Sequence, residues 1–404
     1  MLRTFKNFAH LLNAVLANVY FGFPDRKLTV IGVTGTDGKT TTVHLIYHLL
    51  KQADKKVSMI STVQIRVGNT QHARGLHATT PSPWILQKML RQSVNQGDEY
   101  FVLEVTSHGL DQHRVWGIPF TVGVLTNVTH EHLDYHQTME QYVRSKLKLL
   151  QQSRIAIFPH QFQISHFKFL NKLSITNNQL RKQITFGLKK GNVTLQNFPF
   201  STSLAGDYNK LNCLAAISVA QALKISNVTI RSALPSFTGV RGRMEEVNTG
   251  KGFRVIIDYA HTPYAFENVL KTLKPTVKGR LIHVFGACGG RDRSKRPLMG
   301  EIAARYDDVI ILTEEDYGTE NVTDIIRQLE DGINHQSSTI NHQLLLIIPD
   351  RSEAIGKAVT LAKNGDLILL TGIGHQRFMT RGREEVPWDE KKEVERSIKQ
   401  MNEQ

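Results

Sequence analysis

The chain has 404 residues, 40% of them apolar, and a formal net charge of +14. It has no run of the roughly 18 apolar residues that a membrane span needs and no small-residue signal cleavage site, and its two cysteines, Cys213 and Cys288, show no CxxC spacing. These features argue against stable membrane insertion, a disulfide framework and a thiolate zinc site. We expect a cytoplasmic protein of two or three domains.

The positive charge favours polyanionic partners, which include nucleic acid, anionic lipid headgroups and phosphorylated metabolites. The lysines and arginines are spread along the chain without a recognisable nucleic-acid-binding motif. We therefore predict no nucleic-acid partner, and a nucleotide-handling enzyme accounts for the charge.

Residues 1–27 are predicted to form an N-terminal helical extension, because Phe8, Leu12, Val15 and Val19 recur at helical spacing before glycine and proline. A packing helix is the ordinary interpretation. A helix at a membrane surface is the alternative.

Two series of short apolar runs alternate with helical patterns, which is typical of parallel, doubly wound sheets. The predicted strands are 28–33, 57–63, 101–105 and 122–127 in the first series, and 255–259, 281–285, 309–313, 344–348 and 367–371 in the second. We predict an α/β fold with a central P-loop ATP-binding domain at 28–238 and a smaller Rossmann-like C-terminal ligase domain at 239–404. Residues 151–200 are polar and irregular, and their role is open.

The segment VTGTDGKTTT, residues 33–42, lies between a predicted strand and a predicted helix, as a phosphate-binding loop requires. Gly35 and Gly38 let the backbone turn tightly and direct N–H groups at phosphate oxygens. Lys39 is suited to the terminal phosphates, and Thr40 to Mg²⁺. The general GxxxxGK[ST] pattern has glycine where this chain has Val33.

Two further polar segments follow predicted strands, at the sheet edge where ligands bind in such folds. FVLEVTSHGLDQHRV delivers Glu104, which is suited either to a metal ion or to an ion pair. TNVTHEHLDYH places His130, His132 and His136 close together. A zinc site is the obvious alternative, but the spacing matches no HExxH pattern, so we expect one histidine beside a magnesium-nucleotide site and structural roles for the others.

In the C-terminal half, DYAHTP and GACGGRDRSKRPLMG also follow predicted strands. Arg291, Arg293, Lys295 and Arg296 carry charges suited to a carboxylate or phosphate. Solvated surface charge is the alternative for each of them.

Taken together, these segments resemble the Mur ligase family. GTDGKTT, EVTSHGLDQHRV, TNVTHEHLDYH, LAGDYNKLN, GRMEEV, DYAHTP and RDRSKRPLMG occur in family order. The resemblance implies an ATP-dependent ligase that adds a free amino acid to a nucleotide-sugar peptide, a UDP-N-acetylmuramoyl-dipeptide-like carboxylate, through an acyl phosphate in peptidoglycan precursor synthesis.

The resemblance also implies roles for individual residues. ATP is expected at Gly35, Thr36, Asp37, Gly38, Lys39, Thr40, Thr41, Asn209, Asn212, Arg243, Asp258 and His261. The peptide substrate is expected at Thr79, Thr80, Thr106, Gln112 and Arg114, and the carboxylate of the amino acid at Arg291. Thr40, Glu104 and His132 are expected to arrange two magnesium ions, Lys146 to be carbamylated, and Lys39, Lys146, His132 and Glu104 to form the catalytic set.

Three departures from the family pattern leave the substrates open. About thirty residues precede the P-loop, where family members carry a uridine-binding domain of roughly a hundred. Gly318 stands where the diaminopimelate-specific DNPR pattern has arginine, and Gln376 replaces a glutamate. A lysine- or ornithine-like side chain facing Glu314, Glu315 and Asp316 is the charge-based alternative.

Two functional alternatives also remain. One is an amide ligase of the same family acting on a folate, polyglutamate or cyanophycin-type acceptor. The other is a non-catalytic nucleotide-binding subunit, which the intact set of Lys39, Thr40, Glu104, His132 and Lys146 argues against. The oligomeric state is open.

Overall fold

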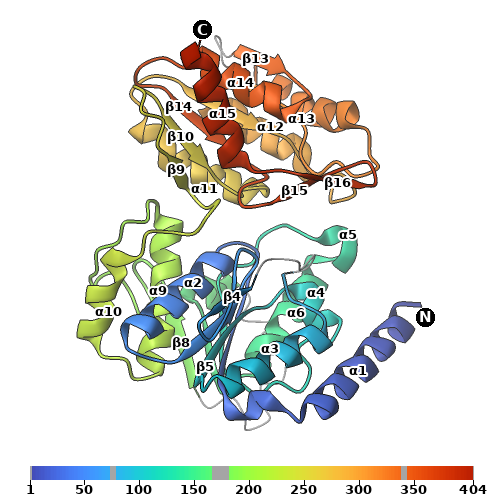
Figure 1. Cartoon of the computed structure of the whole chain (residues 1–404), viewed down its shortest axis with the longest axis vertical. Helices are drawn as coiled ribbons and strands as arrows, with labels where there is room; N and C mark the ends of the chain where they lie inside the picture. Colours follow the sequence, from blue (N-terminus) through green and yellow to red (C-terminus); the bar gives the residue numbers. More distant parts are fainter. Residues whose placement is uncertain (1, 73–78, 166–181, 338–343, 404) are drawn as a thin grey trace. The chain divides into compact units, whose positions relative to one another are not determined.

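The computed structural model describes residues 2–72, 79–165, 182–337 and 344–403. The chain divides into two compact units (Figure 1). The first comprises Met1–Thr129 and His136–Thr238, and the second His130–Tyr135 and Gly239–Gln404. The short segment His130–Tyr135 therefore belongs to the second unit although the first surrounds it in sequence.

The first unit contains an eight-stranded sheet in the order β4-β3-β2-β5-β1-β6-β7-β8. Its strands are β1 (Thr29–Thr34), β2 (Val57–Ile60), β3 (Ile65–Val67), β4 (Thr70–His72), β5 (Tyr100–Glu104), β6 (Phe120–Leu125), β7 (Ile155–Pro159) and β8 (Lys182–Phe186). β3 pairs antiparallel with both β2 and β4 at one edge, and the other neighbouring strands pair parallel. The central strands β1, β5 and β6 are almost entirely buried, as a sheet covered on both faces requires.

The helices of the first unit connect these strands. They are α1 (Leu2–Phe21), the 3₁₀ helix η1 (Pro24–Lys27), α2 (Lys39–Gln52), α3 (Pro83–Asn95), α4 (Ser107–Asp111), α6 (Met139–Gln151), α7 (His160–Ser165), α9 (Asp207–Ala222), α10 (Asn227–Ala233) and η2 (Leu234–Ser236); α5 (Leu133–His136) spans the boundary between the units. α9 packs on α2, and α1 packs on α3. α2 begins directly after the loop that follows β1, so its N-terminus lies at the carboxyl edge of the sheet.

The second unit contains a six-stranded sheet in the order β13-β12-β11-β14-β10-β9 and a small β15-β16 hairpin. The strands are β9 (Glu245–Val247), β10 (Arg254–Ile257), β11 (Leu281–Phe285), β12 (Val309–Leu312), β13 (Leu344–Ile347), β14 (Leu367–Leu370), β15 (Phe378–Arg381) and β16 (Glu384–Pro387). Only the pairing of β9 with β10 is antiparallel within the larger sheet.

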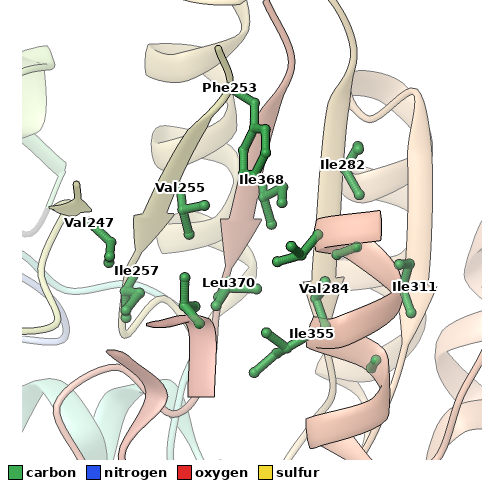
Figure 2. Packing of buried hydrophobic residues seen from close by; sticks show 14 of the residues in the cluster. Val247, Phe253, Val255, Ile257, Ile282, Val284, Ile311, Ile355, Ile368 and Leu370 are labelled. Carbon is green, nitrogen blue, oxygen red and sulfur yellow. The ribbon is translucent and has the colours of Figure 1, made fainter. Parts of the chain in front are cut away.

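The helices of the second unit are α11 (Pro263–Leu273), η3 (Lys274–Thr276), α12 (Lys295–Tyr306), α13 (Val322–Ser337), α14 (Arg351–Leu361) and α15 (Glu390–Glu403). Alternate residues of the strands, including Val255, Ile282, Ile311 and Ile368, form one apolar face, against which Ile355 of α14 packs (Figure 2). Phe266 of α11 contacts Phe285 on the other face. Side chains alternate across a strand, so both faces of this sheet are covered by helices.

The predicted α/β class with two doubly wound sheets is confirmed. Nine predicted strands are found, with ends that differ from the prediction by at most three residues. The N-terminal helix predicted to end at glycine and proline is found as α1, which ends at Phe21, and the short helix η1 follows at Pro24–Lys27. The sequence did not indicate the strands β3, β4, β7, β8 and β9 or the hairpin. β3, β4 and β9 have only three residues each, and β7 and β8 lie in residues 151–200, whose role the sequence left open. None of the described helices has both the length and the apolar character that a membrane crossing requires.

Candidate active site

The loop between β1 and α2 is tightly enclosed by neighbouring side chains. Gly38 has φ 78°, and a Cβ there would overlap the Asn212 side-chain amide. A Cβ at Gly35 would overlap the Thr126 hydroxyl. The backbone N–H groups of Thr36 and Asp37 donate to Asn127 Oδ1 at 3.2 and 2.9 Å. The two glycines are therefore required by packing as well as by backbone conformation.

Two lysines direct their ammonium groups at this loop. Lys39 Nζ donates to the carbonyl of Thr36 at 2.7 Å, and Lys146 Nζ, from α6, to the carbonyl of Gly35 at 2.6 Å. The Lys146 side chain is 2% exposed and lies over the Tyr142 ring, 4.3 Å from its centroid. With the N-terminus of α2, these cations create a positive potential suited to a polyphosphate.

Glu104 ends β5 beside this loop. Its carboxylate accepts hydrogen bonds from the Thr40 hydroxyl at 3.0 Å and from the Thr62 backbone N–H at 2.7 Å. The side chains of Glu104 and Thr40 are buried. The adjacent hydroxyl and carboxylate are the hard oxygen ligands that Mg²⁺ prefers, and Mg²⁺ at nucleotides typically uses one or two protein ligands together with phosphates and water. Within the described ranges no three His, Cys, Asp or Glu side chains form a metal cage.

The predicted peptide-binding residues lie around the same carboxylate and share hydrogen bonds. The Thr80 hydroxyl donates to the Glu104 carbonyl at 3.1 Å and accepts from the Thr106 N–H at 2.9 Å. Arg114 donates to the Thr80 carbonyl at 2.7 Å and to Gln112 Oε1 at 2.7 and 3.0 Å.

Thr79 joins the network through the Thr62 hydroxyl, which donates to its Oγ1 at 3.0 Å. Thr62 in turn binds Glu104 through its N–H. The structure thus brings Thr79, Thr80, Thr106, Gln112 and Arg114 into one hydrogen-bonded network next to the P-loop.

The two asparagines predicted at the nucleotide lie on α9, behind the P-loop. Asn212 accepts a hydrogen bond from the Thr42 hydroxyl at 3.4 Å and donates to Asn209 Oδ1 at 3.2 Å. Asn209 donates to the carbonyl of Ala205 at 2.8 Å. The buried pair is therefore held in a fixed orientation against Gly38 and α2.

The histidines of the THEHLDYH segment separate into two groups. His136 is buried in the first unit, where its Nε2 contacts the Ser107 hydroxyl at 3.0 Å, which confirms a structural role. His130 contacts Asp292 at 3.1 Å within the second unit. His132 lies on the same segment, with a left-handed backbone at φ 58°. Its predicted role as a metal ligand stays a prediction.

Arg243, Asp258 and His261 meet at the carboxyl end of β10 in the second unit. Asp258 accepts from the backbone N–H groups of Met244 and Ala260, both at 2.7 Å. The Arg243 guanidinium lies 4.5 Å from the centroid of the Tyr259 ring, and His261 Nδ1 is 2.8 Å from the Tyr259 carbonyl. Burial raises the pKa of Tyr259, so its ring is a neutral platform for the guanidinium.

The basic segment after β11 is mostly structural, so a ligand-binding role for all four cations is not supported. Lys295 and Arg296 are buried and pair with Glu131 at 3.3 Å and Glu320 at 2.8 Å. Arg293 also reaches Glu320, at 3.1 Å. The side chain of Arg291 is exposed, as an arginine that meets a diffusing ligand requires.

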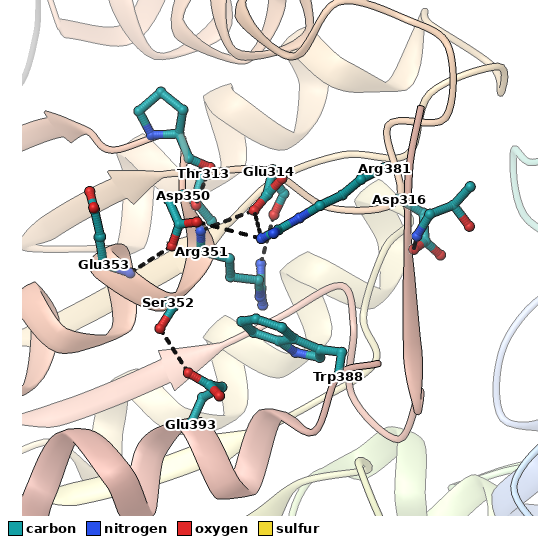
Figure 3. A network of polar contacts seen from close by, with 12 residues as sticks. Thr313, Glu314, Asp316, Asp350, Arg351, Ser352, Glu353, Arg381, Trp388 and Glu393 are labelled. Atoms are coloured by element: carbon teal, nitrogen blue, oxygen red, sulfur yellow. Dashed lines mark hydrogen bonds and ion pairs between the residues drawn. The ribbon is translucent and has the colours of Figure 1, made fainter. Parts of the chain in front are cut away.

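The acidic residues after β12 are also engaged with partners (Figure 3). Glu314 pairs with Arg381, and Asp316 accepts from the Gln376 side-chain amide at 2.6 Å. Cys288 Sγ contacts Glu315 Oε1 at 2.8 Å. Burial raises the pKa of Glu315, and its second carboxylate oxygen has no hydrogen-bond partner among the described residues.

Sequence reasoning missed three residues that shape the site: Thr62, Asn127 and Tyr142. Asn127 is the last residue of the predicted strand 122–127, so its position at a strand end was a usable signal, but functional roles were assigned to the neighbouring histidines instead. Tyr142 OH lies 3.0 Å from the Thr36 hydroxyl and could have been noted four residues before Lys146 on the same helix. Thr62 belongs to no motif.

Comparisons with known proteins agree with this geometry. Residues 33–220 match the Mur ligase middle domain, and residues 242–374 match the Mur ligase, glutamate ligase domain. A UDP-N-acetylmuramoyl-L-alanyl-D-glutamate--2,6-diaminopimelate ligase of Geobacillus thermodenitrificans is 36% identical over 96% of this chain and 82% of its own length. A UDP-N-acetylmuramyl-tripeptide synthetase of Roseiflexus sp. is also 36% identical, over 97% and 83%.

Among solved structures, a diaminopimelate ligase of the same name aligns with TM-score 0.60 and 29% identity over 93% of this chain and 79% of that one. The folylpolyglutamate synthase of Mycobacterium tuberculosis, complexed with ADP and AMPPCP, aligns with TM-score 0.69 over 91% and 96%; at 14% identity it shows the shared fold alone. The chain therefore belongs to the Mur ligase family, whose members are ATP-dependent enzymes that form amide bonds.

Proposed function

We propose that this chain joins an amino acid to the free carboxylate of UDP-N-acetylmuramoyl-L-alanyl-D-glutamate, using ATP, during peptidoglycan precursor synthesis in the cytoplasm. The acceptor is the one named for the relatives at 36% identity. The observation that supports this proposal most directly is a hydrogen-bond network around Glu104. Its carboxylate binds the P-loop residue Thr40, and its carbonyl binds Thr80, which in turn contacts Thr106 and Arg114. This network places candidate nucleotide and acceptor residues side by side.

The first chemical step brings two anions together. An oxygen of the acceptor carboxylate attacks the γ-phosphorus of ATP, the bond from that phosphorus to the β,γ-bridging oxygen breaks, and ADP leaves with the bonding electrons. Lys39 and the backbone N–H groups at the start of α2 offset the repulsion, because they lie where the phosphate charge is expected.

The second step forms the amide. The uncharged amine of the amino acid attacks the carbonyl carbon of the acyl phosphate, the tetrahedral intermediate collapses, and inorganic phosphate leaves with the oxygen of the broken C–O bond. The amine nitrogen loses one proton to solvent or to a neighbouring base. Arg114 and the threonines around it are suited to orient the acceptor so that the acyl carbon is held in place.

The side chains at the P-loop fit Mg²⁺, with Thr40 and Glu104 as ligands and His132 as a third candidate. When bound, Mg²⁺ would neutralise phosphate charge. Carbamylation of Lys146 would replace its ammonium with an anion that suits a second ion. The buried position of Lys146 beside the loop supports this proposal, because a carbamate there would lie close to the expected phosphates and Mg²⁺.

We further propose that residues 28–238 bind ATP and the acceptor and that residues 239–404 bind the amino acid, with Arg243, Asp258 and His261 contributing to the nucleotide site. Arg291 is proposed to bind the carboxylate of the amino acid, supported by its exposure and charge.

For the amino acid we propose a cationic side chain without a second carboxylate, such as lysine or ornithine, although several relatives are named for 2,6-diaminopimelate. Gly318 offers no guanidinium for a distal carboxylate. Glu315 retains a buried carboxylate oxygen without a partner in the described residues, whereas Glu314 and Asp316 are engaged. Of the three acidic residues, we therefore propose that Glu315 meets the cationic side chain.

The test is phosphate release from ATP by the purified full chain, given UDP-N-acetylmuramoyl-L-alanyl-D-glutamate and one amino acid at a time. Turnover with lysine or ornithine supports both proposals. Turnover with diaminopimelate alone supports the ligase and overturns the amino-acid assignment.

Lys39→Ala should abolish turnover, while Lys51→Ala, at the far end of the same helix, should retain it. Absence of turnover with every amino acid, in protein that binds ATP, would contradict the acceptor assignment.

A further inference from the structure

Helix α1 is packed with its small residues inward. Ala14, Ala17 and Asn18 are buried against α3. Asn18 donates to the Trp116 carbonyl at 3.1 Å and accepts from the Gln87 side-chain amide at 3.0 Å. This face is therefore fixed to the first unit by close packing and by specific hydrogen bonds.

The opposite face of α1 is apolar and exposed. Phe8, Leu12, Leu16, Val19 and Tyr20 are 57%, 48%, 60%, 61% and 73% exposed. Their spacing of three or four residues places them on one stripe, about 18 Å long at 1.5 Å per residue. A surface helix of a globular protein normally turns its large apolar residues toward the core, so α1 has the reverse arrangement.

Aromatic residues extend the stripe onto α3. Trp84 and Ile85 are 38% and 37% exposed, and the Trp84 ring contacts those of Tyr20 and Phe21, with centroids 5.4 and 6.1 Å apart. Figure 1 shows α1 alongside α3 at the rim of the first unit. Aromatic side chains with one polar atom are typical of the boundary between water and lipid.

The charges around the stripe are positive. Neither α1 nor α3 contains an aspartate or glutamate, whereas Lys6 and Lys88 on these helices and Arg26 and Lys27 on η1 are exposed. Asp25, the acidic residue of η1, is buried. This composition complements an anionic surface and disfavours the approach of a second copy of the same basic face.

We propose that the apolar stripe of α1 docks the protein onto anionic lipid bilayers, with α1 lying in the plane of the interface. Phe8, Leu12, Leu16, Val19 and Tyr20 enter the region between headgroups and acyl chains, and Trp84 lies at its edge. The basic side chains contact the headgroups. The inference is independent of the reaction proposed above.

The test is flotation of the full-length protein with vesicles of phosphatidylcholine containing phosphatidylglycerol, and with vesicles of phosphatidylcholine alone. Wild type should float with the anionic vesicles, less with the neutral ones, and less at high salt. Leu12→Glu with Leu16→Glu should weaken binding about tenfold or more for each leucine replaced. Val228→Glu with Leu344→Glu, which changes the charge equally at exposed residues elsewhere, should bind like wild type.

Leu12→Ser with Leu16→Ser provides a second variant that adds no charge and should also lose binding. Wild type that remains unbound to anionic vesicles overturns the proposal, as does equal loss of binding in the Val228/Leu344 control. Sedimentation velocity without lipid gives a further outcome: a dimer that Leu16→Ser dissociates would show that a second copy covers the stripe, and would also overturn it.

Discussion

The two sheets end in polar residues at their carboxyl edges, but their charged groups are held differently. In the first unit, Lys39 and Lys146 donate to backbone carbonyls, and Glu104 accepts from a hydroxyl and a backbone N–H. In the second unit, acids pair with arginines, as Glu320 does with Arg296. A backbone carbonyl orients an ammonium group but leaves its positive charge in place. A carboxylate, in contrast, neutralises the charge of the guanidinium with which it pairs. The first arrangement suits ligand binding, and the second suits structure.

The largest expected effect on stability comes from the buried pair of Arg351 and Glu390, whose side chains are 0% and 1% exposed. Arg351→Met leaves Glu390 buried without its partner, so the free energy of unfolding should fall by about 3–5 kcal/mol. Urea denaturation measures this change. Arg254→Met, which breaks the exposed pair with Glu246, should cost only about 0–1 kcal/mol. A similar loss of unfolding free energy in both variants would contradict the expectation that the buried ion pair matters more for stability than the exposed one.

Glu104→Gln tests the first unit. The amide keeps the size of the side chain and one acceptor oxygen but loses the charge. We expect turnover to fall about 10²- to 10³-fold and the Mg²⁺ concentration at half-maximal rate to rise, while the thermal midpoint changes little. Initial rates over a magnesium series, with calorimetry of the same preparation, give both results. A large loss of stability with normal turnover would assign Glu104 to structure.

The pair of Glu320 with Arg296 should contribute to acid stability. The hydrogen bond from Arg296 lowers the pKa of Glu320 to about 2, below its ordinary 4.5. The folded state therefore favours the ionised form, so this stabilisation is present above pH 4.5 and is lost as the pH falls toward 2. Unfolding free energies of wild type and Glu320→Gln should differ at pH 6 and converge near pH 2. A constant difference across this range would exclude the ion pair as its cause.

The smallest effect is expected at Asp25, an acidic residue of the first unit that lies outside the P-loop network. It is fully buried, and neither carboxylate oxygen has a hydrogen-bond partner among the described residues. Burial raises the pKa of Asp25 above 3.8, so its contribution to stability is full below that value and is lost as the pH rises through the raised pKa. Asp25→Asn should be more stable than wild type at pH 7, because it removes the cost of burying the ionised carboxyl group. No gain at pH 7, or an equal gain at pH 3, would contradict this.

Most of the sheet framework could be predicted because apolar runs and glycine turns are local signals. The P-loop and Glu104 were predictable for the same reason, since the P-loop directly follows a strand and Glu104 is the last residue of one. Partners distant in sequence were not: nothing near Glu314 indicates Arg381, and nothing near Lys295 indicates Glu131. Thr62, which binds Glu104 through its backbone, carries no signal in its side chain.

Helix α1, which buries its small residues and exposes its large apolar ones, shows another limit of prediction from sequence. Its helical periodicity was visible in the sequence, but the pattern alone favoured packing of the large apolar residues. Which face is buried depends on the partner surface, and α3 accepts the small residues Ala14 and Ala17. Periodicity gives the faces of a helix, whereas tertiary packing decides between them.

The membership of His130–Tyr135 in the second unit has a consequence for dissecting the protein. The chain passes from one unit to the other three times, at Thr129, Tyr135 and Thr238. A fragment starting at Gly239 would contain Lys295, which is 2% exposed, without the carboxylate of Glu131 that lies 3.3 Å away. Separate expression of the C-terminal half would therefore yield a fragment in which Lys295 has lost its ion-pair partner, whereas a circularly permuted or grafted fragment that carries residues 130–135 would keep that pair.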